Sequence, residues 1–180
     1  ITEIDTKKNI LLLDQITDPR NLGAIIRIAA AFGIEDIIIT KQFKPKDISL
    51  IAKASSGGLE YVSLIEVTNL SRTIEQVKEK LPQNPLIAAT TSYGAFKPDA
   101  NTLVETGLGQ THLGWLGAVD STLRQSIEPF LSAILPPSNW HQDISLALWK
   151  KLAINAVINP LTAINNLKNG ELADIKYNVN

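Results

Sequence analysis

Residues 10 to 33 contain a strand, a turn, a helix cap and a helix in immediate succession. Ile10 to Leu13 form a short, unbroken apolar run, which is typical of a strand buried on both faces. Asp18 can cap the helix that follows, and Pro19 fits its first turn. Gly33 can end this helix because glycine tolerates the left-handed conformation. This succession predicts the beginning of an α/β fold.

The predicted helix has two different faces. Its apolar residues recur at three- and four-residue spacing and predict a core face made of Leu22, Ile25, Ile26 and Ala29. Arg20, Gly23 and Arg27 fall on another face. Two guanidinium groups beside a position without a side chain leave room for a flat or anionic ligand, close to the positive end of the helix. The alternative is an amphipathic helix whose arginines are only solvated.

The composition narrows the classes of function. The chain has 180 residues, of which 44% are hydrophobic, so it can bury a substantial core. A net charge of −1 gives no overall basic surface, and RNA binding would therefore need a local basic patch. The absence of cysteine excludes disulfides and thiolate catalysis. His112 and His141 lie far apart in the sequence, which argues against a histidine metal cluster, and we expect no metal.

Localisation can be predicted from what the sequence lacks. No apolar run approaches the roughly 20 residues of a membrane span, and the first residues do not resemble a signal peptide. We therefore expect a soluble, cytoplasmic protein without a membrane partner. The chain begins at Ile1 and contains no methionine, which suggests a piece of a longer protein or a recombinant.

The remainder of the first half continues the α/β order. Residues 36–40 (DIIIT) predict a second buried strand, parallel to the first. A short helix is expected over 47–54, before the small-residue stretch Ser55 to Gly58, which can either approach a ligand closely or form a plain turn. A strand over 61–67 and a helix over 68–80 complete this half.

Two segments of this half resemble one enzyme family. The stretch LDQITDPRNLGAIIRIAAAFG resembles the first signature of the SpoU-type RNA 2′-O-methyltransferases, which have a trefoil knot, and KASSGGLE at 53–60 resembles the segment that follows it. The resemblance implies S-adenosylmethionine as cofactor and functional roles for Asn21 and Arg27. It also implies RNA binding, for which Arg20, Lys53 and the basic segment 41–53 are the candidates.

The sequence changes character at residues 81–85 (LPQNP), where two prolines and an asparagine predict a junction between a segment 1–80 and a segment 86–180. We expect a strand over 86–91 and two or three antiparallel strands over 90–114, with a hairpin turn at Asp99 to Asn101. A helix over 122–135 should follow. Its predicted apolar face consists of Ile127, Phe130, Leu131 and Ile134.

A last helix, from Asp143 or Ser145 to about Asn159, aligns three polar residues. Lys151, Asn155 and Asn159 are spaced by four and lie on one face. The amine could protonate an alkoxide, and the carboxamides could orient a carboxylate or hydroxyl. The alternative is a solvated polar stripe. Pro160 should turn or kink the chain after Asn159.

The second half resembles a different family. LWKKLAINAVINPLTAINNLKNGEL at 148–172 resembles the signature of ketopantoate reductases, and TTSYGAFKPDANTLVETGLGQTHLG resembles their hairpin region. The resemblance implies a catalytic acid at Lys151, substrate contacts at Asn155, Asn159 and Asn169, NADPH as cofactor and a small 2-oxo acid, 2-dehydropantoate, as substrate.

Neither half contains everything that its chemistry needs. The chain has no G-x-G-x-x-G turn for NADPH, and segments 113–125 and 134–148 overlay poorly on the later motifs that close the S-adenosylmethionine site in SpoU-type enzymes. Three hypotheses follow: an RNA 2′-O-ribose methyltransferase-like protein, a ketopantoate reductase-like protein, or a catalytically empty fusion of two partial families. A sheet edge left by either truncation would favour a homodimer.

Overall fold

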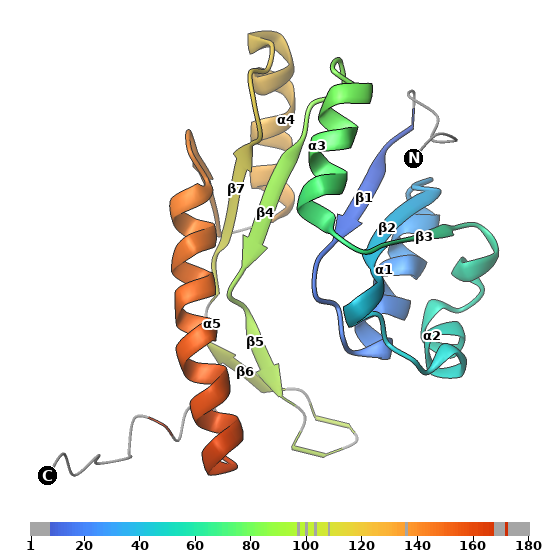
Figure 1. Ribbon diagram of the computed structural model, residues 1–180, viewed down its shortest axis with the longest axis vertical. Helices are drawn as coiled ribbons and strands as arrows, with labels where there is room; N and C mark the ends of the chain where they lie inside the picture. Colours follow the sequence, from blue (N-terminus) through green and yellow to red (C-terminus); the bar gives the residue numbers. More distant parts are fainter. Residues whose placement is uncertain are drawn as a thin grey trace, which may run out of the picture. The chain divides into compact units, whose positions relative to one another are not determined.

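The computed structural model describes residues 8–96, 98–99, 101–102, 104–107, 109–135, 137–167 and 172 (Figure 1). The chain is divided into two compact units, Ile1–Asn84 and Pro85–Asn180. The first contains a parallel sheet and the second a mixed sheet with helices, so the α/β prediction is confirmed.

The N-terminal unit contains three parallel strands in the order β1-β2-β3. Along the chain its elements are β1 (Ile10–Leu13), α1 (Pro19–Ala31), β2 (Asp36–Thr40), the 3-10 turn η1 (Lys41–Phe43), α2 (Ile48–Ser55), the 3-10 turn η2 (Gly58–Glu60), β3 (Ser63–Val67) and α3 (Leu70–Lys80). Asp18 caps α1, and Gly33 has a φ of 70°, as predicted.

The central strand carries the core of this unit. Ile37, Ile38 and Ile39 are completely buried, because β2 has a neighbour on each side. Ile37 and Ile39 belong to the main cluster, which also contains Leu22, Ile26, Ala29, Ile51 and Val62. Ile38 points to the opposite face of the sheet. The prediction that β1 is buried on both faces is wrong: its residues are half-buried, because β1 is an edge strand with a single neighbour.

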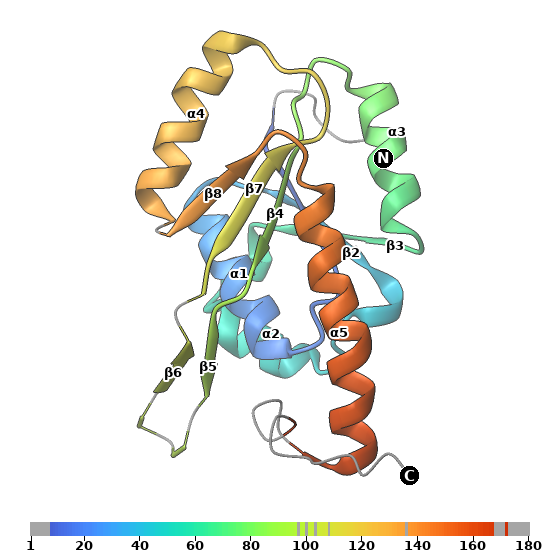
Figure 2. The same cartoon turned by 90° about the vertical axis from the view of Figure 1, so that its left-hand side faces the viewer.

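The C-terminal unit contains two small sheets (Figure 2). Its elements are β4 (Ile87–Thr91), β5 (Gly94–Phe96), β6 (Val104–Gly107), β7 (Thr111–Trp115), α4 (Ser121–Ile134), β8 (Ser138–His141) and α5 (Ser145–Asn165). In the first sheet β7 is antiparallel to β4 and parallel to β8, and β5 and β6 form an antiparallel pair. Asp99 accepts hydrogen bonds from the backbone N–H groups of Asn101 and Thr102, which supports the predicted hairpin turn.

Two tryptophans attach α4 to the sheet. Trp115 Nε1 donates to Glu128 Oε1 at 2.7 Å, Trp140 Nε1 donates to Ser132 Oγ at 3.0 Å, and the two rings stack. These contacts turn Phe130 and Ile134 towards solvent, where they are 61% and 56% exposed. The predicted apolar face of this helix is therefore wrong in those two residues, because tryptophan hydrogen bonds decide its orientation.

The last helix is longer than predicted. α5 runs through Pro160 to Asn165, so the prediction of an end near Asn159 is wrong. Proline removes one backbone donor. Thr162 Oγ1 donates to the carbonyl groups of Ile158 and Asn159, and Asn165 Nδ2 donates to that of Leu161. Side-chain donors thus supplement the hydrogen bonding of the turns around the proline.

Candidate functional site

The helix α1 carries three polar residues of the predicted site. Arg20, Asn21 and Arg27 are exposed, whereas the predicted core face is buried at Leu22, Ile26 and Ala29 and half-buried at Ile25. Arg20 and Arg27 are seven positions apart and share a face of the helix. Asn21 and Arg27 are six positions apart, so they point about 120° away from each other around the axis. The structure therefore does not bring the two predicted catalytic residues together.

Gly23 does not leave a space for a ligand between the two arginines. A Cβ atom at this position would lie 2.5 Å from Cβ of Ala54 and 2.7 Å from the carbonyl oxygen of Ile51. The missing side chain instead allows α2 to pack closely on α1. The prediction of an open position on this face is wrong, because helix packing fills it. Lys53 precedes Ala54 on α2, and its side chain is exposed.

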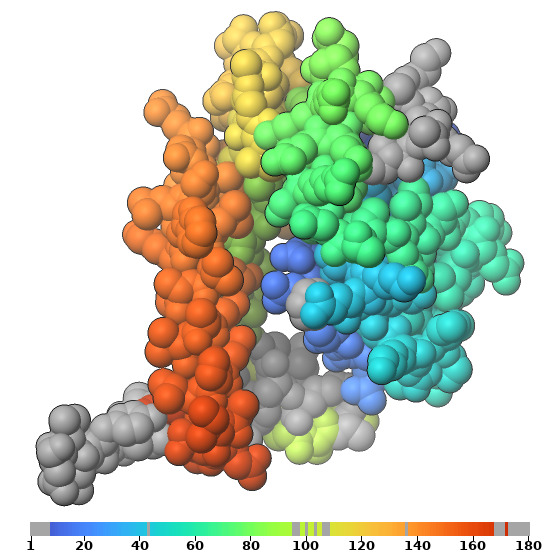
Figure 3. Space-filling view, in the orientation of Figure 1, coloured from blue at the N-terminus to red at the C-terminus, as the bar shows by residue number. Residues whose placement is uncertain are grey.

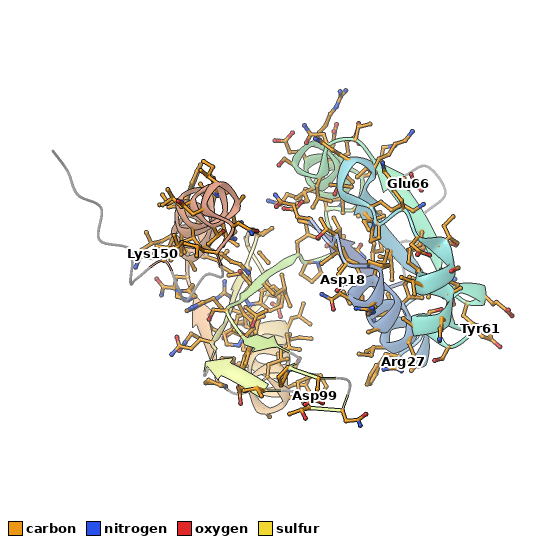
Figure 4. All side chains as sticks on the ribbon, turned by 90° about the horizontal axis from the view of Figure 1, so that it is seen from below. Asp18, Arg27, Tyr61, Glu66, Asp99 and Lys150 are labelled. Carbon is orange, nitrogen blue, oxygen red and sulfur yellow. The ribbon has the colours of Figure 1, made fainter. Side chains whose placement is uncertain are left out.

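After α2, the residues Ser55 to Gly58 turn the chain so that it contacts α1. Ser56 and Gly57 are both left-handed, with φ of 50° and 87°. A Cβ atom at Gly58 would lie 3.1 Å from Cα of Arg27. Gly58 therefore permits close approach to the α1 backbone, which is neither the approach to a ligand nor the plain turn that the sequence left open. Figure 4 shows Arg27 on α1 and Tyr61 directly after η2.

Three exposed cations lie on the two helices that pack at Gly23, two of them on α1 and one on α2. We call Arg20, Arg27 and Lys53 the basic cluster; all three are exposed. Among the described residues, the ion pairs join Lys8 to Glu35, Lys44 to Glu66 and Arg124 to Glu128, and none includes a member of this cluster. The cluster thus keeps its full positive charge towards solvent. Such a surface can bind phosphate groups.

Part of the predicted basic segment 41–53 is neutralised within the unit. Lys44 forms an ion pair with Glu66. The hydrogen bond from Lys44, followed by the positive charges of Lys44 and Lys41, lowers the pKa of the Glu66 carboxyl group. This glutamate therefore stays ionised at neutral pH and offsets charge on the loop. Lys53 is exposed, and none of the ion pairs found among the described residues includes it.

The polar face of α5 is present in the C-terminal unit. Lys151, Asn155 and Asn159 are all exposed, and Lys151 Nζ donates to the carbonyl oxygen of Thr91 at 2.7 Å. This bond fixes the amine at the end of β4. Asn169, the fourth residue of the predicted substrate site, lies outside the described residues.

The described residues do not fit NADPH. A dinucleotide needs a free helix N-terminus for its pyrophosphate. In each α-helix in the described part of the chain, a side-chain oxygen accepts a hydrogen bond from one of the first backbone N–H groups. These oxygens belong to Asp18, Asp47, Asn69, Asp120 and Asp143. Hydrogen bonds, chiefly from the Thr122 N–H and the Ser145 hydroxyl, lower the pKa of Asp120 and Asp143, respectively. The carboxylates of Asp120 and Asp143 are therefore negative and would repel a phosphate at the starts of α4 and α5.

The described residues also do not build a cradle for S-adenosylmethionine. In the segment 113–125, a Cβ atom at Gly114 would lie 2.6 Å from Cβ of Ile144, so this glycine serves the packing of β7 against the start of α5. Asp120, the acid of the same segment, caps α4. The space beside Gly109 is likewise occupied, because a Cβ atom there would lie 2.3 Å from the backbone nitrogen of Tyr93. Gly109 and Gly114 are thus used by the unit itself, whereas a Cβ atom at Gly117 would meet no atom within 4 Å.

The histidines are closer than their sequence separation suggests. β7 and β8 pair in parallel and place Nδ1 of His112 2.9 Å from Nε2 of His141. Sequence reasoning missed this pair because it depends on strand pairing. Among the described residues, no group of three or more potential ligands could hold a metal ion. In that part of the chain, no helix is long and apolar enough to cross a membrane.

Comparison with known proteins finds similarity to two families. Residues 8–105 match the SpoU rRNA methylase family, and residues 143–179 match the C-terminal domain of ketopantoate reductase. A 2-dehydropantoate 2-reductase from Vibrio cholerae is 39% identical over 109 residues, which are 61% of this chain and 36% of the relative. A putative TrmH family tRNA/rRNA methyltransferase from Staphylococcus aureus is 44% identical over 70 residues, which are 39% of this chain and 28% of the relative. The resemblance to both families is thus confirmed.

Solved structures are similar only at a low level. The SpoU methyltransferase AviRb from Streptomyces viridochromogenes, in complex with the cofactor AdoMet, gives a TM-score of 0.39 at 22% identity over 44% of this chain and 30% of that one. The 2-dehydropantoate 2-reductase from Methylococcus capsulatus gives 0.40 at 14% identity over 88% and 65%. The chain spans about a third of the length of the curated relatives, 36% and 28% in the two cases above.

Proposed function

The chain belongs to the SpoU rRNA methylase family, with which more than half of it matches, and on this premise we propose that its N-terminal unit binds RNA through the basic cluster. Arg20 and Arg27 would contact the phosphate backbone from α1, and Lys53 would contact it from α2. Asn21, at the start of α1, would reach the same RNA from the neighbouring side of the helix. The substrate class is an RNA strand rather than a small molecule.

The observation that carries the proposal is the unpaired state of the basic cluster. Its three cations stay exposed and without an acidic partner among the described residues, although Lys44 in the same unit is paired with Glu66. The net charge of the whole chain is −1, so any attraction for RNA must be local. Arg20 and Arg27 share one face of α1, about two turns apart, which suits contacts with two phosphates of one strand.

The proposal is limited to binding, because the described residues do not provide a methyl donor site. RNA 2′-O-ribose methylation would need S-adenosylmethionine beside the ribose, and Gly114 and Asp120 serve packing and capping instead. We therefore propose no chemical step. Transfer of a labelled methyl group from S-adenosylmethionine to RNA should stay at background.

Arg27→Ala should weaken RNA binding about tenfold at moderate salt, because one phosphate contact is lost. Arg27→Lys should restore most of the affinity, since the contact depends chiefly on positive charge. The measurement is fluorescence anisotropy of a labelled rRNA hairpin titrated with each protein.

The matched control for this test is Arg72→Ala, which removes an exposed arginine from α3 of the same unit. It should leave the affinity within about twofold of the original, since it lies outside the basic cluster. Equal losses for Arg27→Ala and Arg72→Ala would show that only bulk charge matters, and the proposed site would be wrong.

We propose, as a second candidate, that the C-terminal unit binds a small 2-oxo acid. The hydrogen bond from Lys151 to Thr91 favours it, because it fixes an amine on the helix face that also carries Asn155 and Asn159. Reduction of such an acid would need NADPH, which the described residues do not fit. Binding without turnover is therefore the expected behaviour.

Lys151→Ala should remove the heat of binding of 2-dehydropantoate in a calorimetric titration. Lys150→Ala is the matched control, because Lys150 is an exposed neighbour of Lys151 on the same helix and points to another side. A normal titration of Lys151→Ala would remove this lysine from the site. NADPH should give no heat with any of the three proteins.

A further inference from the structure

α5 carries an apolar stripe that the C-terminal unit does not cover. The stripe consists of Leu146, Trp149, Ala153, Val157, Pro160 and Ile164, which recur at three- and four-residue spacing and share one face. All six are exposed. Leu146, Trp149, Val157 and Ile164 are 63%, 67%, 59% and 80% exposed, respectively. Figure 3 shows α5, in orange and red, as a continuous exposed column.

The stripe lies on the opposite side of the helix from the sheet contact. Lys151, which bonds to Thr91, points about 160° away from the centre of the stripe. The half-buried residues of the helix, among them Ile158 and Leu161, also lie away from it. A long helix that is apolar on nearly all sides normally has neighbours on nearly all sides.

We propose that this stripe pairs with the same stripe of a second copy of the chain, with the two α5 helices antiparallel. Around a two-fold axis near Asn155, Leu146 of one copy would lie opposite Ile164 of the other, and Ala153 opposite Val157. The stripe suits this arrangement because its large residues stand near its two ends and a small one, Ala153, lies close to the axis. A small residue there allows the helices to approach.

The area of the stripe reaches the lower limit for a dimer interface. With full surfaces of about 150–250 Å² for large side chains, the exposed parts of its four large residues amount to roughly 500 Å² per copy. Two copies would bury on the order of 1,000 Å², which is the lower limit for a specific interface. Backbone and flanking side chains add to this value.

Charge favours the antiparallel over the parallel arrangement. The ionisable side chains of α5 are Lys150 and Lys151, both near its start. Parallel helices would place the two Lys150 side chains, which flank the stripe, beside each other. In the antiparallel pair each Lys150 instead lies beside the C-terminal half of the partner helix, whose end is negative.

Sedimentation velocity of the full chain tests the proposal. The original protein should sediment as a dimer at micromolar concentration, and Trp149→Glu should raise the dissociation constant by about 100-fold or more. Phe130→Glu is the matched control, because Phe130 is 61% exposed on α4 and lies outside the stripe. It should leave the dimer intact. A monomeric original protein, or equal dissociation by both substitutions, would overturn the proposal.

Cysteine cross-linking tests the direction of the helices, since the chain contains no cysteine of its own. A mixture of Leu146→Cys and Ile164→Cys proteins should form a disulfide between copies under mild oxidation, because only the antiparallel pair brings these positions within disulfide distance. Leu146→Cys alone should stay uncross-linked. Cross-linking of Leu146→Cys with itself would show parallel helices and contradict the proposed pair.

Discussion

The Gly23→Leu substitution is expected to unfold the N-terminal unit under conditions in which the original unit is stable. Even the first added atom would lie 2.5 Å from Cβ of Ala54 and 2.7 Å from a carbonyl oxygen of α2. These are atoms of a helix backbone and its attached methyl group, which cannot rotate away. Overpacking of this kind costs about 1–3 kcal/mol or more, a large part of the roughly 4–12 kcal/mol expected for 80 residues.

Gly23→Ala separates packing from helix propensity. Alanine is favoured over glycine in a helix by about 1 kcal/mol, so propensity alone predicts stabilisation. Destabilisation of Gly23→Ala, smaller than that of Gly23→Leu, would show that the contact with α2 outweighs propensity. Ala31→Leu is the control, because it adds the same side chain at an exposed position of α1.

Urea denaturation followed by far-ultraviolet circular dichroism measures these effects. The tryptophans are at 115, 140 and 149, so their fluorescence reports the C-terminal unit separately. If Gly23→Leu unfolds at the same urea concentration as Ala31→Leu, the close packing of α1 on α2 is wrong.

Reversal of the basic cluster is expected to have the largest effect on binding. The triple variant Arg20→Glu, Arg27→Glu and Lys53→Glu replaces attraction by repulsion at three exposed positions of α1 and α2. RNA affinity should fall on the order of 100-fold or more, because several phosphate contacts are lost together. All three side chains are exposed, so the fold should persist, which circular dichroism can check.

The matched control for the reversal uses α3. Arg72→Glu, Lys78→Glu and Lys80→Glu make the same change in net charge at exposed positions of the same unit. This variant should retain RNA affinity within about fivefold, because it changes only the general field of the protein. Equal losses in the two triple variants would mean that the cluster has no special role.

The elements of the N-terminal unit could be predicted because their signals are local. The apolar runs at 10–13 and 36–40 and the cap Asp18 each depend on a few neighbouring residues. The structure places these elements within about two residues of the predicted bounds. Local propensity and tertiary packing therefore agree in this unit.

The incorrect predictions concern features that depend on residues far away in the sequence. Ala54 fills the space beside Gly23, and His112 contacts His141. Sequence spacing does not show either contact. The orientation of α4 depends on hydrogen bonds from Trp115 and Trp140. The candidate site follows the same rule: the face shared by Arg20 and Arg27 could be predicted from helical spacing, whereas the packing of α2 against Gly23 on that face could not.

The dependence of RNA affinity on salt tests most directly whether the basic cluster binds the phosphate backbone. For single strands, the logarithm of the affinity falls with the logarithm of the salt concentration by about 0.7 for each phosphate contact. The original protein should therefore show a slope that is steeper by roughly 2 than that of the triple variant Arg20→Glu, Arg27→Glu and Lys53→Glu. The same slope for both proteins would contradict the account.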